Sequence, residues 1–140
     1  MKTVLLALAL LAPTIPSDDR PGDRYVTGQV WAYRTRSGEE GSLLKIQAIE
    51  YDAAAIRGGP IYHVSVIGVH FADPQIAPIL PHVPVSRATL DASVTRLVAS
   101  ATDFPDATEG IAEWRRERGG VYTIPLADII AAIDAQTGRK

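Results

Sequence analysis

The sequence predicts an α+β fold, in which an antiparallel meander of three to four strands comes first and three helices then pack on the sheet. Three observations support this prediction. In the first half of the chain, three stretches alternate apolar and polar side chains, as half-buried strands do. Short segments rich in glycine and charged residues separate these stretches, which is typical of hairpin turns. In the second half, apolar residues recur at helical spacing.

The three alternating stretches predict strands at residues 25–36, 42–52 and 61–71. In the first strand, Trp31 and Tyr33 point to the same face, because side chains two residues apart share a face. These aromatic rings are expected in the core, although an aromatic sheet face left open would bind a ligand. In the third strand, Gly68 is a candidate position for a bulge.

Residues 73–85 contain four prolines, and the last three are spaced three residues apart. The favoured interpretation is an extended crossover that lies on the sheet. The alternative is a polyproline II segment that a proline-recognising partner binds.

Helices are predicted from residue 86 to about 101, from residue 106 to the glycines at 119–120, and from residue 125 to 138. Ser86 is the expected N-cap of the first helix. Leu90, Val94 and Leu97 begin a stripe at helical spacing, which predicts a buried face for that helix.

The chain divides into a predicted signal peptide (residues 1–17), a polar linker (18–24) and one α+β domain (25–138). Lys2 precedes an unbroken apolar run that Pro13 ends, as in secretory signals, and the run is shorter than the ~20 residues that span a bilayer. We therefore expect an exported bacterial protein, periplasmic or secreted, with no stable membrane insertion after processing.

Composition narrows the function classes. The net charge of −2 lacks the strong positive balance of nucleic-acid-binding domains, so no nucleic-acid partner is expected. The chain contains no cysteine, which excludes disulfides and makes the core the source of stability.

Several short motifs together resemble a family of small uncharacterised bacterial proteins. The resemblance covers most of the chain from Tyr25 to about Ile133 but not residues 1–24, and it implies a shared fold without an assigned activity. Its motifs are Gly28-Gln29-Val30-Trp31, Tyr33, Thr35-Arg36, Glu39-Glu40, His63-Val64-Ser65-Val66, His82, Pro84, Ser86, Glu109-Gly110, Trp114 and Val121-Tyr122-Thr123-Ile124-Pro125.

The three histidines are the first candidates for chemistry, since histidine transfers protons and binds metals near neutral pH. His63 or His82 could form an acid/base pair with a carboxylate, for which the candidates are Glu50, Asp52 and Asp73. No spacing of metal ligands stands out, so neither a metal nor another cofactor is expected.

Arginines and glutamates gather around the first predicted hairpin. Arg34 and Arg36, together with Glu39 and Glu40, indicate either a charged recognition tip or a solvated turn with weak ion pairs, each worth ~0–1 kcal/mol. The residues weighed as a binding site are Trp31, Tyr33, Arg34, Arg36, His63 and His82.

Two functional hypotheses follow. The first is a non-catalytic binding or interaction module for an unknown protein or small ligand, which the lack of a recognisable catalytic set favours. The alternative is a small hydrolase or metal-dependent enzyme that uses His63 and His82. Imidazole rings within about 5 Å of each other, beside an acid and opening onto a cleft, would support the enzyme.

Overall fold

The computed structural model describes residues 22–51, 59–98 and 103–138. The predicted signal peptide and most of the predicted linker lie outside these ranges. The predicted α+β fold is confirmed: three helices accompany an antiparallel sheet, and the sheet has five strands in place of three to four. None of the helices in the described ranges combines the length and the apolar character needed to cross a membrane.

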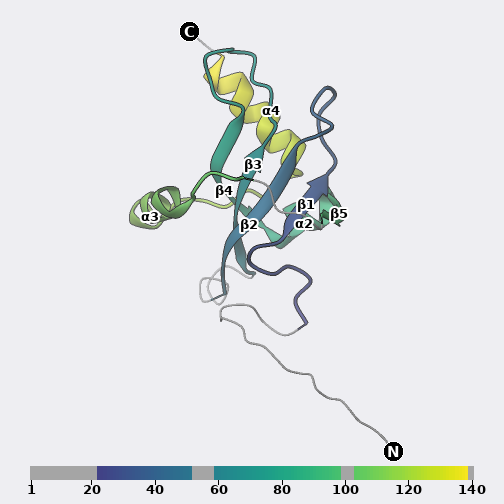
Figure 1. The fold of residues 1–140 in the computed structure, drawn as a ribbon. Coiled ribbons are helices and arrows are strands. Elements are labelled where there is room, and N and C mark those ends of the chain that lie inside the picture. The colour runs from purple at the N-terminus through teal and green to yellow at the C-terminus, as the bar shows by residue number, and fades with distance from the viewer. Residues whose placement is uncertain (1–21, 52–58, 99–102, 139–140) are drawn as a thin grey trace, which may run out of the picture.

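All neighbouring strands of the sheet pair antiparallel, in the order β4-β3-β2-β1-β5 (Figure 1). The strands are β1 (Val30–Tyr33), β2 (Leu43–Glu50), β3 (Ile61–Ile67), β4 (Ile79–Ser86) and β5 (Val94–Val98). The meander predicted from the first three strands is confirmed, and the proline-rich crossover continues it as edge strand β4. Prolines suit an edge strand because they lack the N–H that a central strand must donate.

The long helix predicted from residue 86 to about 101 is wrong. Ser86 does cap a helix by accepting a hydrogen bond from the Thr89 backbone, but this helix, α2 (Arg87–Ser93), is short and leads directly into β5. β5 pairs with the second edge of β1, where Tyr33 opposes Val94 and Val30 opposes Val98. Pairing satisfies the backbone groups along that edge of β1, so tertiary context outweighs the local helical spacing.

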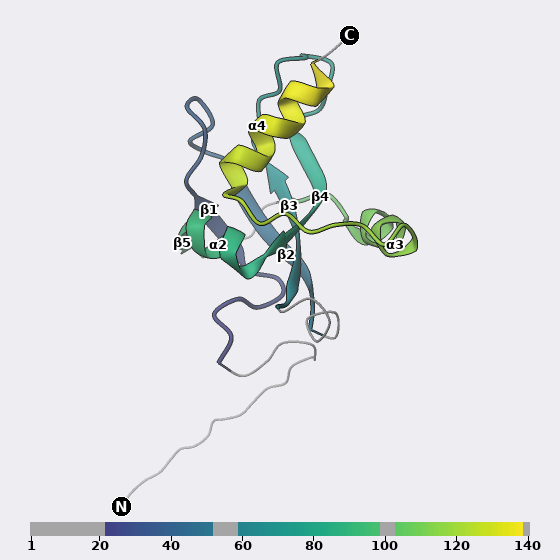
Figure 2. The ribbon, with the colours of Figure 1, turned by 180° about the vertical axis from the view of Figure 1, so that it is seen from behind.

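The apolar core lies on one face of the sheet, beneath α2 and α4 (Leu126–Thr137). Helix α4 crosses this face, behind the sheet in Figure 1 and in front of it in Figure 2. Buried side chains of both helices meet those of the strands there. They include Leu44, Ile46, Tyr62, Val64, Val66, Val83, Val85, Leu90, Leu126, Ile129 and Ile130.

The third helix, α3 (Thr108–Arg116), does not join this core cluster. It lies beside β4, away from α2 and α4 (Figures 1 and 2). Its one buried residue is Ile111. Two polar side chains connect the α3 region to β2, because Gln47 donates to the Pro105 carbonyl and Arg115 donates to Glu50.

Asp23 fastens the N-terminal part of the described chain to one end of the sheet. Its carboxylate accepts hydrogen bonds from the hydroxyls of Tyr51 (2.5 Å) and Tyr62 (3.2 Å) and from the guanidinium of Arg87 (2.8 Å). These bonds hold the pKa of Asp23 below its usual value even though burial, the largest single influence, acts to raise it. We call this cluster the Asp23 anchor.

Candidate functional site

A chain of polar side chains runs diagonally across the face of the sheet opposite the apolar core. Glu50 on β2, His63 on β3 and His82 on β4 form it. Glu50 pairs with Ile61, and His63 lies two residues after Ile61 on β3. His63 pairs with Pro84, and His82 lies two residues before Pro84 on β4. Diagonal neighbours of this kind are within reach of long side chains.

A register shift between Ile46 and Ala48 places Glu50 on this face. With regular alternation, Glu50 would share the face of Leu44 and Ile46, which are fully buried in the core. The extra residue in β2 reverses the alternation, so that Ile49 turns to the core and Glu50 turns to His63.

The three side chains are joined by short hydrogen bonds. His63 Nε2 lies 3.0 Å from Glu50 Oε2, and His63 Nδ1 lies 2.8 Å from His82 Nε2. The two imidazole rings are stacked with centroids 5.0 Å apart. Arg115 of α3 donates to the same Glu50 oxygen from Nε (2.7 Å) and Nη2 (2.6 Å). We call Arg115, Glu50, His63 and His82 the polar relay.

The hydrogen bonds of the relay determine where its protons lie. The Glu50 carboxylate can only accept, so the proton shared with it belongs to His63 Nε2. In a neutral imidazole the other nitrogen is then an acceptor, and His63 Nδ1 must receive a proton from His82 Nε2. Neutral His82 is consequently left with an unprotonated Nδ1.

Burial favours the neutral form of both histidines. Desolvation lowers the pKa of His63, whose side chain is fully buried, and outweighs the opposite effect of Glu50. Desolvation, reinforced by the neighbouring His63, lowers the pKa of His82 to about 4. Both rings are therefore uncharged at neutral pH, and His82 is a proton acceptor.

Helix α3 covers the relay at very short range. A Cβ atom at Gly110 would lie 2.7 Å from Cβ of His82, so this approach requires glycine. The indole of Trp114 meets His63 edge to face, with ring centroids 4.9 Å apart. Trp114 Nε1 donates to the Gly120 carbonyl (2.9 Å), and a side chain at Gly119 would collide with the indole.

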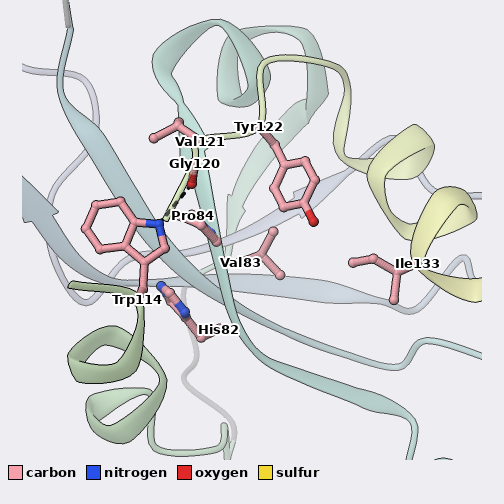
Figure 3. A pocket seen from close by; sticks show the side chains of 8 residues that line it. All are labelled: His82, Val83, Pro84, Trp114, Gly120, Val121, Tyr122 and Ile133. Carbon is pink, nitrogen blue, oxygen red and sulfur yellow. Dashed lines mark hydrogen bonds between the residues drawn. The ribbon is translucent and has the colours of Figure 1, made fainter. Parts of the chain in front are cut away.

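A pocket of about 470 Å³ opens beside His82 (Figure 3). Its lining comes from β4, α3, α4 and the segment that follows α3. The lining residues are His82, Val83, Pro84, Trp114, Gly120, Val121, Tyr122 and Ile133. Figure 3 shows His82 beneath the indole of Trp114, and the hydroxyl end of Tyr122 directed toward the space between Val83 and Ile133.

His82 Nδ1 is the ring nitrogen of the two histidines that is left as a free acceptor by the described residues. Within the described ranges, every buried side-chain nitrogen and oxygen has a hydrogen-bond partner. The hydrogen bond of the His82 ring is made by Nε2, so Nδ1 keeps some solvent-exposed area, although it lies close to Gly110 of α3. His82 lines the pocket, and Nδ1 is the nitrogen of its ring that is not engaged in a hydrogen bond within the described residues.

The candidate residues on β1 lie elsewhere. Trp31 and Tyr33 are only 6% and 5% exposed and belong to the apolar core. The Trp31 indole donates to Gln29, and the Tyr33 hydroxyl hydrogen-bonds that of Ser42. β1 is separated from β3 by β2, so these residues are not part of the relay.

The arginines of the first hairpin hold parts of the chain together. Arg36 donates to Glu39, to the His70 carbonyl and to Asp134 of α4, and Glu39 is 3% exposed. Arg34 donates to a backbone carbonyl at the end of α2. Of the six residues weighed as a site, the structure brings together His63 and His82.

The other acid/base and metal candidates do not join the relay. Asp52 lies outside the described residues, and Asp73 borders a separate hollow beside the end of α4. His70 is exposed. Among the residues that the structure describes, no three histidine, aspartate or glutamate side chains are placed to hold a metal ion.

Sequence reasoning missed Arg115 as a member of the site, because alternating charges on α3 indicate a solvated helix face. Gly110 was a usable signal, since a glycine within a helix costs ~1 kcal/mol relative to alanine and suggests a close contact.

Comparisons with protein-family models, with curated proteins and with solved structures found no match to this chain. The family resemblance of the sequence motifs therefore stays a prediction, and the geometry of the site carries the functional argument.

Proposed function

We propose that this protein binds a small, uncharged molecule with a flat ring in the pocket beside His82. The observation that carries the proposal is the pocket itself. Its volume of about 470 Å³ falls within the ~300–1,000 Å³ of small-molecule sites. Trp114 and Tyr122 supply aromatic surfaces, and Val83 and Ile133 supply aliphatic ones.

The uncharged lining of the pocket favours an uncharged ligand. The described residues that line the pocket include no lysine, arginine, aspartate or glutamate, so an ionic ligand would lose hydration without a partner among them. His82 Nδ1 is a hydrogen-bond acceptor, so the preferred ligand carries a hydroxyl or N–H donor on its ring.

A matched pair of compounds tests this proposal. Phenol carries a ring hydroxyl, and anisole has the same ring with that donor replaced by a methoxy group. We expect phenol to shift the NMR signals of the Trp114 indole N–H and of His82, and anisole to bind about 2–10-fold more weakly, as the loss of one hydrogen bond predicts. Trp114→Ala should weaken the binding of both phenol and anisole.

The indole signal of Trp31 is the internal control, because this residue is buried in the core on the other side of the sheet. If neither compound moves the Trp114 signal at millimolar concentration, or if both move Trp31 equally, the pocket is not the binding site.

We also propose, from residues 1–17 alone, that the protein is exported and acts in the periplasm or outside the cell. Mass spectrometry of material from the cell envelope and the medium tests this. An N-terminus near residue 17 is the expected result, whereas a retained Met1 argues against export with processing.

A further inference from the structure

We infer that His82 is a general base: its Nδ1 takes a proton from a water molecule that attacks the carbonyl carbon of an uncharged ester held in the pocket. Glu50 and His63 act as positioning residues behind it. The inference rests on the proposed ligand site, since the ester would occupy the same pocket.

The polar relay fixes the position and the tautomer of the base, and the low pKa of His82 keeps it unprotonated at neutral pH but makes it a weak base. The hydrogen bond through Nε2 fixes the ring of His82 and leaves the lone pair on Nδ1. When Nδ1 accepts a proton, the Nε2 proton stays in its hydrogen bond to His63, and the Glu50 carboxylate behind His63 offsets the positive charge. Arg115 and Trp114 of α3 hold Glu50 and His63 in place.

The reaction balances without a further reactant. The water oxygen bonds to the carbonyl carbon while one water proton moves to His82 Nδ1. The bond from that carbon to the leaving oxygen then breaks, and Nδ1 returns the proton to this oxygen. The products are a carboxylic acid and an alcohol, and His82 is neutral again.

Phenyl acetate is the probe, because its leaving group is the phenol of the binding experiment. We expect saturable hydrolysis that His82→Gln reduces ~100-fold or more, the range for loss of a general base. His70→Gln is the matched control, since it removes an exposed imidazole from another part of the surface and should leave the rate unchanged.

The pH profile separates this mechanism from adventitious catalysis. Hydrolysis by His82 should lose its rate only as the pH falls toward the low pKa of this residue, whereas an exposed histidine would lose it near 6.5. Glu50→Gln should lower kcat with little change in KM, as expected of a residue that positions the base.

Hydrolysis that is no slower in His82→Gln, or that has its midpoint near pH 6.5, overturns the inference. If phenol binds but phenyl acetate is not hydrolysed above the buffer rate, the general base is overturned and the binding site stands. If phenol does not bind, the proposed function is overturned, and with it the general base that depends on the same pocket. Far-UV circular dichroism verifies that each variant is folded.

Discussion

The two faces of the central sheet are made by the same strands but differ in chemistry. On one face, Leu44, Ile46 and Val64 are fully buried under α2 and α4. On the other, Glu50, His63 and His82 form a hydrogen-bonded chain under α3. The apolar face gains free energy from burial, at roughly 25 cal/mol per Å².

The polar face has to offset a desolvation cost that the apolar face does not have. His63 is fully buried, and each of its nitrogens needs a partner to compensate for lost water. Gly110 adds a conformational cost within α3. Packing for stability alone would favour neither feature, so the polar face is where we place the proposed ligand site.

The largest expected effect comes from the apolar face. Trp31→Ala should lower the free energy of unfolding by ~3–5 kcal/mol, because it removes a buried aromatic side chain of the core. Urea denaturation measures this. Leu97→Ala is the control on an exposed position and should change it by less than about 0.5 kcal/mol. If the Trp31→Ala variant is as stable as the parent protein, Trp31 is not a core residue.

The contact between α3 and the relay gives the next effect. Gly110→Ala should destabilise the fold by ~1–3 kcal/mol, because the added methyl collides with His82. Helix propensity alone predicts the opposite sign, a gain of ~1 kcal/mol. Gly41→Ala, in a turn where a Cβ meets nothing within 4 Å, is the control for an added methyl group that causes no collision. If Gly110→Ala stabilises the protein, α3 does not pack against His82 as closely as described.

The relay also predicts how stability depends on pH. Both histidines have folded-state pKa values below the 6.5 expected in the unfolded chain, so the unfolded state takes up protons first as the pH falls. Stability contributed by the neutral histidines is therefore present above pH 6.5 and is lost between 6.5 and about 4. For the partly buried His82, the loss should be ~1–2 kcal/mol.

Urea denaturation at several pH values checks this dependence, and His82→Gln should flatten it over that range. The carboxylates with lowered pKa values, among them Asp23, Glu39 and Asp134, affect stability mainly at lower pH. A parent protein whose stability is constant from pH 6.5 to 5 would contradict the neutral pair.

The smallest effect is expected at the exposed end of the relay. Arg115→Gln should cost only ~0–1 kcal/mol of stability, because the arginine side chain is 57% exposed and its ion pair with Glu50 is screened. Arg96→Gln, on exposed β5, is the reference for removing a surface charge. If Arg115→Gln lowers the free energy of unfolding by more than ~2 kcal/mol and Arg96→Gln does not, the ion pair with Glu50 contributes more to stability than an exposed ion pair should.

Much of this architecture could be predicted from the sequence, because the first three strands and α4 have periodicities that local spacing reveals. β5 could not, since Leu90, Val94 and Leu97 fit a helix equally well and only the open edge of β1 decides between them. The site was half visible: His63, His82 and Glu50 were candidates, but the register shift in β2 that aims Glu50 at His63 has no local signature.

The Asp23 anchor sets a limit on how the chain can be trimmed. The carboxylate of Asp23 holds Tyr51, Tyr62 and Arg87 together at one end of the sheet. A processing enzyme that cut beyond this residue would remove the carboxylate that pairs with Arg87 and leave its guanidinium beside the Tyr62 hydroxyl. Loss of Asp23 is therefore expected to destabilise the folded domain, so a cleavage site that leaves the domain intact is expected before this residue.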